Sequence, residues 1–168
     1  MINLTSKEIK GYASSSIARN ENKDCFVRAL AAGFEIGYND AHAIAKDRFK
    51  REDKKGTRNE YIVSGMKEIE ESGIAIGDVI AKVKVLKGLD IKNRYKLYGE
   101  LVDRKKTVKS FIKDHPKGNY IVTVSKHAFA LKDGKLIDNK GEEFRPTRKV
   151  DGAYEILLPK DSTQLSLF

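Results

Sequence analysis

The segment NKDCFVRALAAGF spans residues 22–34 and contains Cys25, the single cysteine of the chain. From Cys25 to Phe34 the run is almost wholly apolar, and it is long enough to predict a buried helix rather than a strand. Asp24 or Asn22 can cap the start of this helix, because short polar side chains accept hydrogen bonds from the first free N–H groups. The cysteine then lies on the first turn, and the rest of the fold is expected to pack around this helix.

The chain on either side predicts further helices in its first half and one short helix later. Asn39-Asp40 can cap a second helix that continues to about Phe49, and Asn59 precedes a third that ends at Gly73. Thr107 can cap a short helix that ends before Pro116, because the residue before a proline disfavours helical geometry. The apolar residues at helical spacing in these segments are Ile62, Met66 and Ile69, then Val108, Phe111 and Ile112.

The second half of the chain predicts antiparallel strands. Asp133-Gly134 is a strong turn signal between two runs rich in β-formers. The predicted strands are residues 79–86, 120–124, 126–131, 135–138 and 153–158. Helices first and antiparallel strands after them predict an α+β domain over residues 1–159, followed by a tail over residues 160–168.

Length and composition fit one soluble domain. The chain has 168 residues, 40% of them hydrophobic, which suffices for a single core. No apolar run reaches the roughly 18 residues of a membrane span, and the first residues lack the layout of a signal peptide, so a cytoplasmic protein is expected. A single cysteine excludes an internal disulfide and a zinc site built on cysteines. We expect neither a metal nor a cofactor.

The charge balance favours anionic partners without identifying one. The chain has 33 basic and 24 acidic residues, for a net charge of +9. Basic residues gather at Lys46 to Arg58 and at Arg104 to Lys113, but acids interrupt the first cluster and aromatic residues hardly interleave with either. Solvated helix faces are the better interpretation, and nucleic acid is not expected as the primary partner.

Cys25, His127 and Asp138 have the residue types of a thiol active site. A helix N-terminus and an imidazolium both favour the thiolate, which is the reactive form of cysteine. His127 begins one predicted strand and Asp138 lies beyond the Asp133-Gly134 turn, so the two can meet across adjacent strands, where a carboxylate orients the ring. Asn20 or Asn22 could donate a hydrogen bond to an oxyanion. The simpler alternative is an inert core cysteine, the usual state of a lone cysteine on an apolar helix.

These residues resemble a known family. NKDCFVRAL around Cys25, HPKGNYIV from His115 and HAFALKDGKLID from His127 to Asp138 are similar to the small papain-like cysteine peptidase domains common in phage genomes. The resemblance covers about residues 20–140. It implies a papain-like fold, with Cys25 as nucleophile, His127 as base and Asp138 as the acid that orients it. His42 is interpreted as a packed or capping histidine rather than a catalytic one.

The last five residues form a second motif, Gln164-Leu165-Ser166-Leu167-Phe168. From physical chemistry alone, Leu165, Leu167 and Phe168 would fold back onto the domain as a final strand or staple, because exposed apolar residues at a terminus are unusual. The pentapeptide nevertheless resembles the peptide by which bacterial polymerases and repair proteins dock on the DNA polymerase III β sliding clamp. The resemblance implies that the three apolar side chains enter a pocket of the clamp while Gln164 forms hydrogen bonds at its rim.

The two resemblances together predict a phage protein of host takeover. It is similar to the inhibitors of the host sliding clamp that phages such as Twort encode, which implies that it inhibits host replication by blocking polymerase, clamp-loader or DNA access. A homodimer could place two tails on the two-subunit clamp ring and gain by avidity. The alternative is an active cysteine peptidase with a Cys-His-Asp triad that the tail targets to the replisome. A basic nucleic-acid-binding protein ranks last.

Overall fold

The computed structural model describes residues 3–4, 9–138 and 147–159, and for residues 3–4, 91–97 and 100–104 it describes the backbone alone. Helices precede most of the sheet along the chain, as the sequence predicts for an α+β domain. The helices are α1 (Ser16–Arg19), α2 (Cys25–Phe34), α3 (Tyr38–Phe49), α4 (Asn59–Ser72) and α5 (Val108–Asp114). The strands are β1 (Asn3–Leu4), β2 (Ile74–Ile76), β3 (Val79–Val85), β4 (Asp90–Leu97), β5 (Glu100–Lys105), β6 (Asn119–Val124), β7 (His127–Lys132), β8 (Lys135–Ile137) and β9 (Gly152–Leu157).

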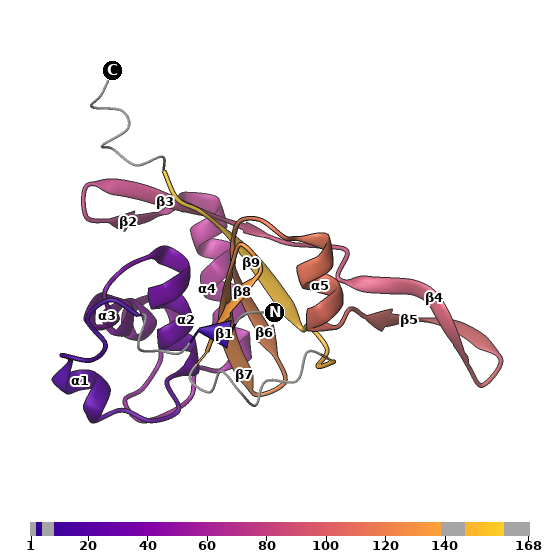
Figure 1. Ribbon diagram of the computed structural model, residues 1–168, viewed down its shortest axis with the longest axis horizontal. Coiled ribbons are helices and arrows are strands. Elements are labelled where there is room, and N and C mark those ends of the chain that lie inside the picture. Colours follow the sequence, from indigo (N-terminus) through magenta and orange to yellow (C-terminus); the bar gives the residue numbers. More distant parts are fainter. Residues whose placement is uncertain (1–2, 5–8, 139–146, 160–168) are drawn as a thin grey trace, which may run out of the picture.

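Within the described residues, seven strands form one open sheet in the order β1-β8-β7-β6-β9-β3-β2. Neighbouring strands are antiparallel except β1 and β8, which are parallel. Strands β4 and β5 form a separate two-stranded ribbon that extends away from the sheet (Figure 1). The antiparallel sheet predicted from the second half of the chain is therefore present, with β9 inserted between β6 and β3.

Helices cover both faces of this sheet (Figure 1). Alternate residues of β6 and β7 point to opposite faces, as in any strand. Ile121, Ala128 and Ala130 belong to the core cluster that contains α2, α3 and α4. Val122 and Phe129 belong to the second cluster, under α5. Helix α2 packs on β7, where the buried Ala128 and Ala130 have small side chains that permit a close approach.

The helix boundaries confirm most of the expected elements and correct two caps. Thr107 caps α5 as predicted, with its hydroxyl accepting from the Ser110 N–H at 3.1 Å. Helix α3 begins one residue before Asn39, with Gly37 at its cap position. Asp24 occupies the cap position of α2 but forms no side-chain cap bond, because its carboxylate is engaged elsewhere.

No helix in the described ranges combines the length and apolar character that a membrane crossing requires. The tail, residues 160–168, lies outside the described residues, and with it the whole of the pentapeptide Gln164 to Phe168.

Candidate active site

Cys25 is the first residue of α2, at the end where the helix dipole favours a negative charge. Behind it, the buried carboxylate of Asp24 accepts a hydrogen bond from the Tyr38 hydroxyl at 2.6 Å and lies 2.5 Å from the Arg28 guanidinium. These bonds explain why Asp24 does not cap the helix through its side chain. They also anchor the residue before the thiol to α2 and α3, so the position of Cys25 is set by buried contacts.

His127 and Asp138 come together where β7 begins and β8 ends, beside the N-terminus of α2. His127 begins β7 and Asp138 follows β8, which the Asp133-Gly134 turn brings alongside β7. Nε2 of His127 lies 2.9 Å from Oδ1 and 2.7 Å from Oδ2 of Asp138. The Asp138 side chain is 5% exposed and that of His127 is 19% exposed, so the pair is shielded from water while the ring stays reachable.

The thiol of Cys25 completes the group. It forms a hydrogen bond with the His127 ring and accepts another from the backbone N–H of Ala128. Because Nε2 of His127 is engaged by Asp138, Nδ1 is the ring nitrogen left for the thiol. The structure thus brings Cys25, His127 and Asp138 into one hydrogen-bonded series that joins a helix terminus to two strands.

The electrostatics of this series favour a thiolate beside an imidazolium. Burial raises the pKa of the Cys25 thiol, but the hydrogen bond and charge of His127, the Ala128 N–H and the Arg28 charge outweigh it and leave that pKa below its usual value. Burial lowers the pKa of His127, but the hydrogen bonds to Asp138 and Cys25 raise it to about 9. Both shifts stabilise the charged form of each partner, which is the state that a thiol nucleophile needs.

A cavity of about 710 Å³ opens beside Cys25 and His127. Three stretches of chain line it: the start of α2, residues 56–62 at the start of α4, and the turn between β6 and β7. The reactive side chains are therefore accessible to a ligand. Basic side chains in each stretch, Lys23, Arg58 and Lys126 among them, also line the cavity. The sequence interpretation missed these residues, although Lys126 directly precedes His127 and Lys23 lies two positions before Cys25.

Asn20 is not part of this group. Its side-chain amide donates to the Ser16 carbonyl at 2.8 Å, and the residue lines a different hollow, together with Glu21 and His42. Its predicted role as an oxyanion donor is corrected here, because the amide is engaged at the end of α1. The backbone carbonyl of Asn22, the other candidate, accepts a hydrogen bond from the Arg51 guanidinium at 3.2 Å. The first N–H groups of α2, the helix that begins at Cys25, lack partners within the helix and can donate instead.

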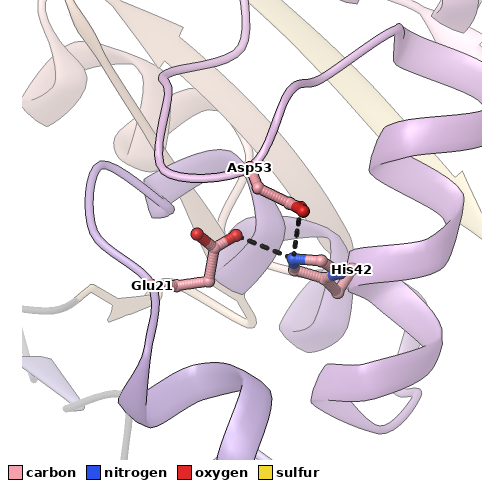
Figure 2. Close-up of side chains that lie close together, drawn as sticks. All are labelled: Glu21, His42 and Asp53. Atoms are coloured by element: carbon pink, nitrogen blue, oxygen red, sulfur yellow. Dashed lines mark hydrogen bonds and ion pairs between the residues drawn. The ribbon is translucent and has the colours of Figure 1, made fainter.

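A second polar cluster lies on the far side of the loop that precedes Cys25. Glu21, His42 and Asp53 place their ligand-type atoms within 4.8 Å of one another (Figure 2). His42 Nε2 lies 2.7 Å from Glu21 and 3.5 Å from Asp53. The other Glu21 contacts, with Arg51 Nη1 at 2.5 Å and with the Lys54 N–H at 2.7 Å, occupy both of its carboxylate oxygens.

This arrangement is that of a structural network rather than of a metal centre. The buried cation that balances Glu21 is already present, since the Arg51 side chain is fully buried, and Lys46 lies 3.3 Å from Asp53. A divalent ion would have to share the space with both. The cluster ties the segment after α3 to the loop before α2. His42 is thus a packed histidine, in agreement with the sequence interpretation.

A scan against models of protein families, a search of curated proteins and a search of solved structures each found no match. The resemblances to papain-like peptidases and to clamp-binding proteins therefore stay predictions. The fold itself is α+β, with an open, mostly antiparallel sheet covered by helices on both faces. Any function for this chain has to be inferred from the chemistry of its own residues.

Proposed function

We propose that the chain is a papain-like cysteine hydrolase that cleaves peptide bonds. One observation carries this proposal: the hydrogen-bonded series from the Cys25 thiol through the His127 ring to the Asp138 carboxylate, at the wall of an open cavity. Each residue has the type and environment that nucleophilic catalysis requires, namely an activated thiol, a base within reach and a carboxylate that orients the base.

The proposed reaction begins with attack of the Cys25 thiolate on the carbonyl carbon of the substrate, which forms the C–S bond and moves an electron pair onto the carbonyl oxygen. The first N–H groups of α2 are available to donate to that oxyanion. Collapse of the intermediate breaks the C–N bond, and the imidazolium of His127 gives its proton to the departing amine. Water then attacks the thioester, His127 takes a proton from it, and the acid product leaves with Cys25 restored.

The test uses the presence of a single cysteine in the chain. Iodoacetamide labels Cys25 alone, so the label measured by mass spectrometry reports directly on its reactivity. We expect alkylation near neutral pH to be at least about tenfold faster than that of a free thiol, because the thiolate fraction is higher. His127→Ala should remove this advantage, and Cys25→Ala should abolish cleavage of a fluorogenic peptide library. A thiol that reacts no faster than free cysteine would contradict the proposal.

We further propose that the segment Gln164 to Phe168 docks the protein on the bacterial sliding clamp. The sequence supports this: three large apolar side chains follow a polar spacer in the order that clamp-binding peptides use. Burying such anchors contributes about 1.5–3 kcal/mol each, and ordering the segment costs part of this, which leaves binding on the order of micromolar. A pull-down with purified clamp should capture the full chain and lose a chain that ends at Asp161. Equal capture of both would place the interface elsewhere.

The second candidate function is inhibition of the clamp by occupancy alone, without chemistry. The same segment favours it, since a bound tail excludes other clamp-binding peptides from the pocket. Cys25→Ala separates the two candidates in a replication assay with purified clamp and polymerase. If inhibition persists in Cys25→Ala but is lost when Leu167 and Phe168 are removed, occupancy is the function. If Cys25→Ala relieves inhibition while clamp capture persists, the chemistry is the function.

A further inference from the structure

The cavity beside Cys25 is lined by positive charge. Lys23, Arg28, Arg58 and Lys126 contribute to its wall, and the described lining residues include neither aspartate nor glutamate. The buried Asp138 lies behind His127, whose imidazolium it balances. A ligand in the cavity therefore meets cationic side chains from all three stretches of chain that line it.

Two of these four charges have ionic partners and two do not. Arg28 lies 2.5 Å from the buried Asp24, so its charge is balanced within the protein. Arg58 lies 3.3 Å from Glu60, but both side chains are about 70% exposed, and solvent weakens such a pair. Lys23 and Lys126 have no ion-pair partner among the described residues. The uncompensated charge thus comes mainly from these two lysines.

The two lysines lie close to the reactive residues along the chain. Lys23 precedes Cys25 by two positions in the loop before α2, and Lys126 immediately precedes His127 in the turn between β6 and β7. Both have left-handed backbone conformations, with φ of 52° for Lys23 and 59° for Lys126. Non-glycine residues adopt this region rarely, so the tight local turn, rather than a flexible chain, sets where each side chain starts. One lysine side chain therefore starts beside the nucleophile and the other beside the base.

Resting on the hydrolase proposed above, we propose that this cleft takes acidic peptides, with Asp or Glu side chains next to the bond that is cleaved. Carboxylates placed there would pair with Lys23 and Lys126 and would displace no acidic group from the wall. A nucleic acid fits less well, because the aromatic residue of the described lining, Phe26, is 1% exposed and offers no surface for stacking bases. Each partly exposed pair should contribute about a two- to fivefold preference.

The first test compares a charged and an uncharged alkylating reagent on Cys25. Iodoacetate has a carboxylate where iodoacetamide has an amide. The alkylation rate with iodoacetate, divided by the rate with iodoacetamide, therefore measures the charge around the thiol. We expect Lys23→Asn/Lys126→Asn to lower the ratio of the iodoacetate rate to the iodoacetamide rate about fivefold. A change in the thiolate fraction affects both reagents equally and cancels in this ratio. Asparagine tolerates the left-handed backbone and preserves the two turns. Lys109→Asn/Lys113→Asn, on exposed positions of α5 at the opposite face of the sheet, changes the net charge equally and should leave the ratio unchanged.

The two proposals fail differently in this test. If the iodoacetamide rate of the unaltered protein is only that of a free thiol, the hydrolase proposal fails. If the iodoacetamide rate is high but the ratio of the iodoacetate rate to the iodoacetamide rate is the same in both double variants, only the acidic-substrate proposal is overturned.

The second test asks whether the anion is a peptide. A hexapeptide with Glu on both sides of its central bond should protect Cys25 from iodoacetamide at a concentration at least about fivefold lower than its Gln counterpart. The difference should vanish in Lys23→Asn/Lys126→Asn. Equal protection by the two peptides would overturn the proposal. Protection by inorganic phosphate at the same concentration as the Glu peptide would also overturn it, because the cleft would then bind anions in general.

Discussion

Asp138 holds the His127 ring with both of its carboxylate oxygens, at 2.7 and 2.9 Å from Nε2. This contact fixes which nitrogen of the ring is free to face Cys25, and it supplies the negative charge that raises the pKa of His127. A thiol and an imidazole on separate elements could meet by chance of packing. A buried carboxylate on the far side of the ring fixes the orientation and the tautomer of the imidazole, so that Nδ1 faces the thiol.

We expect Asp138→Asn to lower kcat/KM for peptide cleavage on the order of 10²- to 10⁴-fold, because the amide neither balances the imidazolium nor fixes its tautomer. The pKa of His127 should fall from about 9 toward its ordinary value, because its largest favourable interaction is lost. A histidine NMR titration measures this shift directly. An unchanged His127 titration would rule out the positioning role of Asp138.

The rate of peptide cleavage should follow a bell-shaped pH profile. On the acid side, the rate rises as the coupled Cys25–His127 pair reaches the thiolate–imidazolium state, at a pH below the usual pKa of a thiol because the Cys25 pKa is lowered. On the alkaline side, it falls near pH 9, as His127 loses the proton that the leaving amine needs. Iodoacetamide alkylation requires only the thiolate and should not fall there. A cleavage rate that keeps rising above about pH 9 would contradict the acid role of His127.

The sequence predicted the elements that bring the three reactive residues together, and the reasons are local. The apolar run after Cys25 predicted α2, and the turn at Asp133-Gly134 placed Asp138 beside the strand of His127. Both signals lie within a few residues of the feature they predict. The strand order was not predictable in this way, because the insertion of β9 between β6 and β3 depends on contacts between residues far apart in the chain.

The residues missed by the sequence interpretation fall into two kinds. Strands β4 and β5 had a readable signal, since Ile91, Tyr95 and Leu97 alternate with charged residues, but the turn at Tyr98-Gly99 lacks the Asn-Gly or Asp-Gly pair that marks a hairpin. The contact between Glu21 and Arg51 had no such signal, because an ion pair between loops depends on how α2 and α3 pack. The same holds for the contribution of residues 56–62 to the cleft.

That ion pair should be important for stability. The Arg51 side chain is fully buried and that of Glu21 is 4% exposed. Glu21→Gln leaves the guanidinium without a balancing charge, and we expect it to lower the free energy of unfolding by about 3 kcal/mol at neutral pH, as measured by urea denaturation. Glu52→Gln is the control: it removes an equal charge from an exposed pair with Lys55 and should have no measurable effect.

The effect of Glu21→Gln should also depend on pH in one direction. Burial raises the pKa of Glu21, but the contacts with Arg51, His42 and Lys54 outweigh it and lower that pKa below 4.5. The stabilisation is therefore fully present above the unfolded pKa and is lost as the pH falls through the folded value. The difference in unfolding free energy between the two proteins should shrink at acid pH. A difference that stays constant down to about pH 2 would show that the carboxylate charge is not its cause.

Gly65 of α4 lies against the Phe49 ring of α3 with no room for a side chain. A Cβ at this position would lie 2.5 Å from Phe49 Cδ1 and 2.9 Å from the Arg48 carbonyl oxygen. Replacing glycine by alanine within a helix normally stabilises it by about 0.5–1 kcal/mol, but forcing extra volume into a packed core costs about 1–3 kcal/mol. The Phe49 ring is fully buried and cannot swing into solvent. Steric strain should therefore outweigh the gain in helix propensity.

We expect Gly65→Ala to lower the free energy of unfolding by about 1–2 kcal/mol, as measured by urea denaturation. Ser64→Ala, on the exposed side of the same helix, should leave it unchanged or raise it slightly, because alanine has the higher helix propensity. Phe49→Leu should cost less in the Gly65→Ala background than alone, since the smaller side chain relieves the clash that the new methyl group creates. Additive effects of the two substitutions would mean that the helices separate freely and that their close approach is not fixed by this contact.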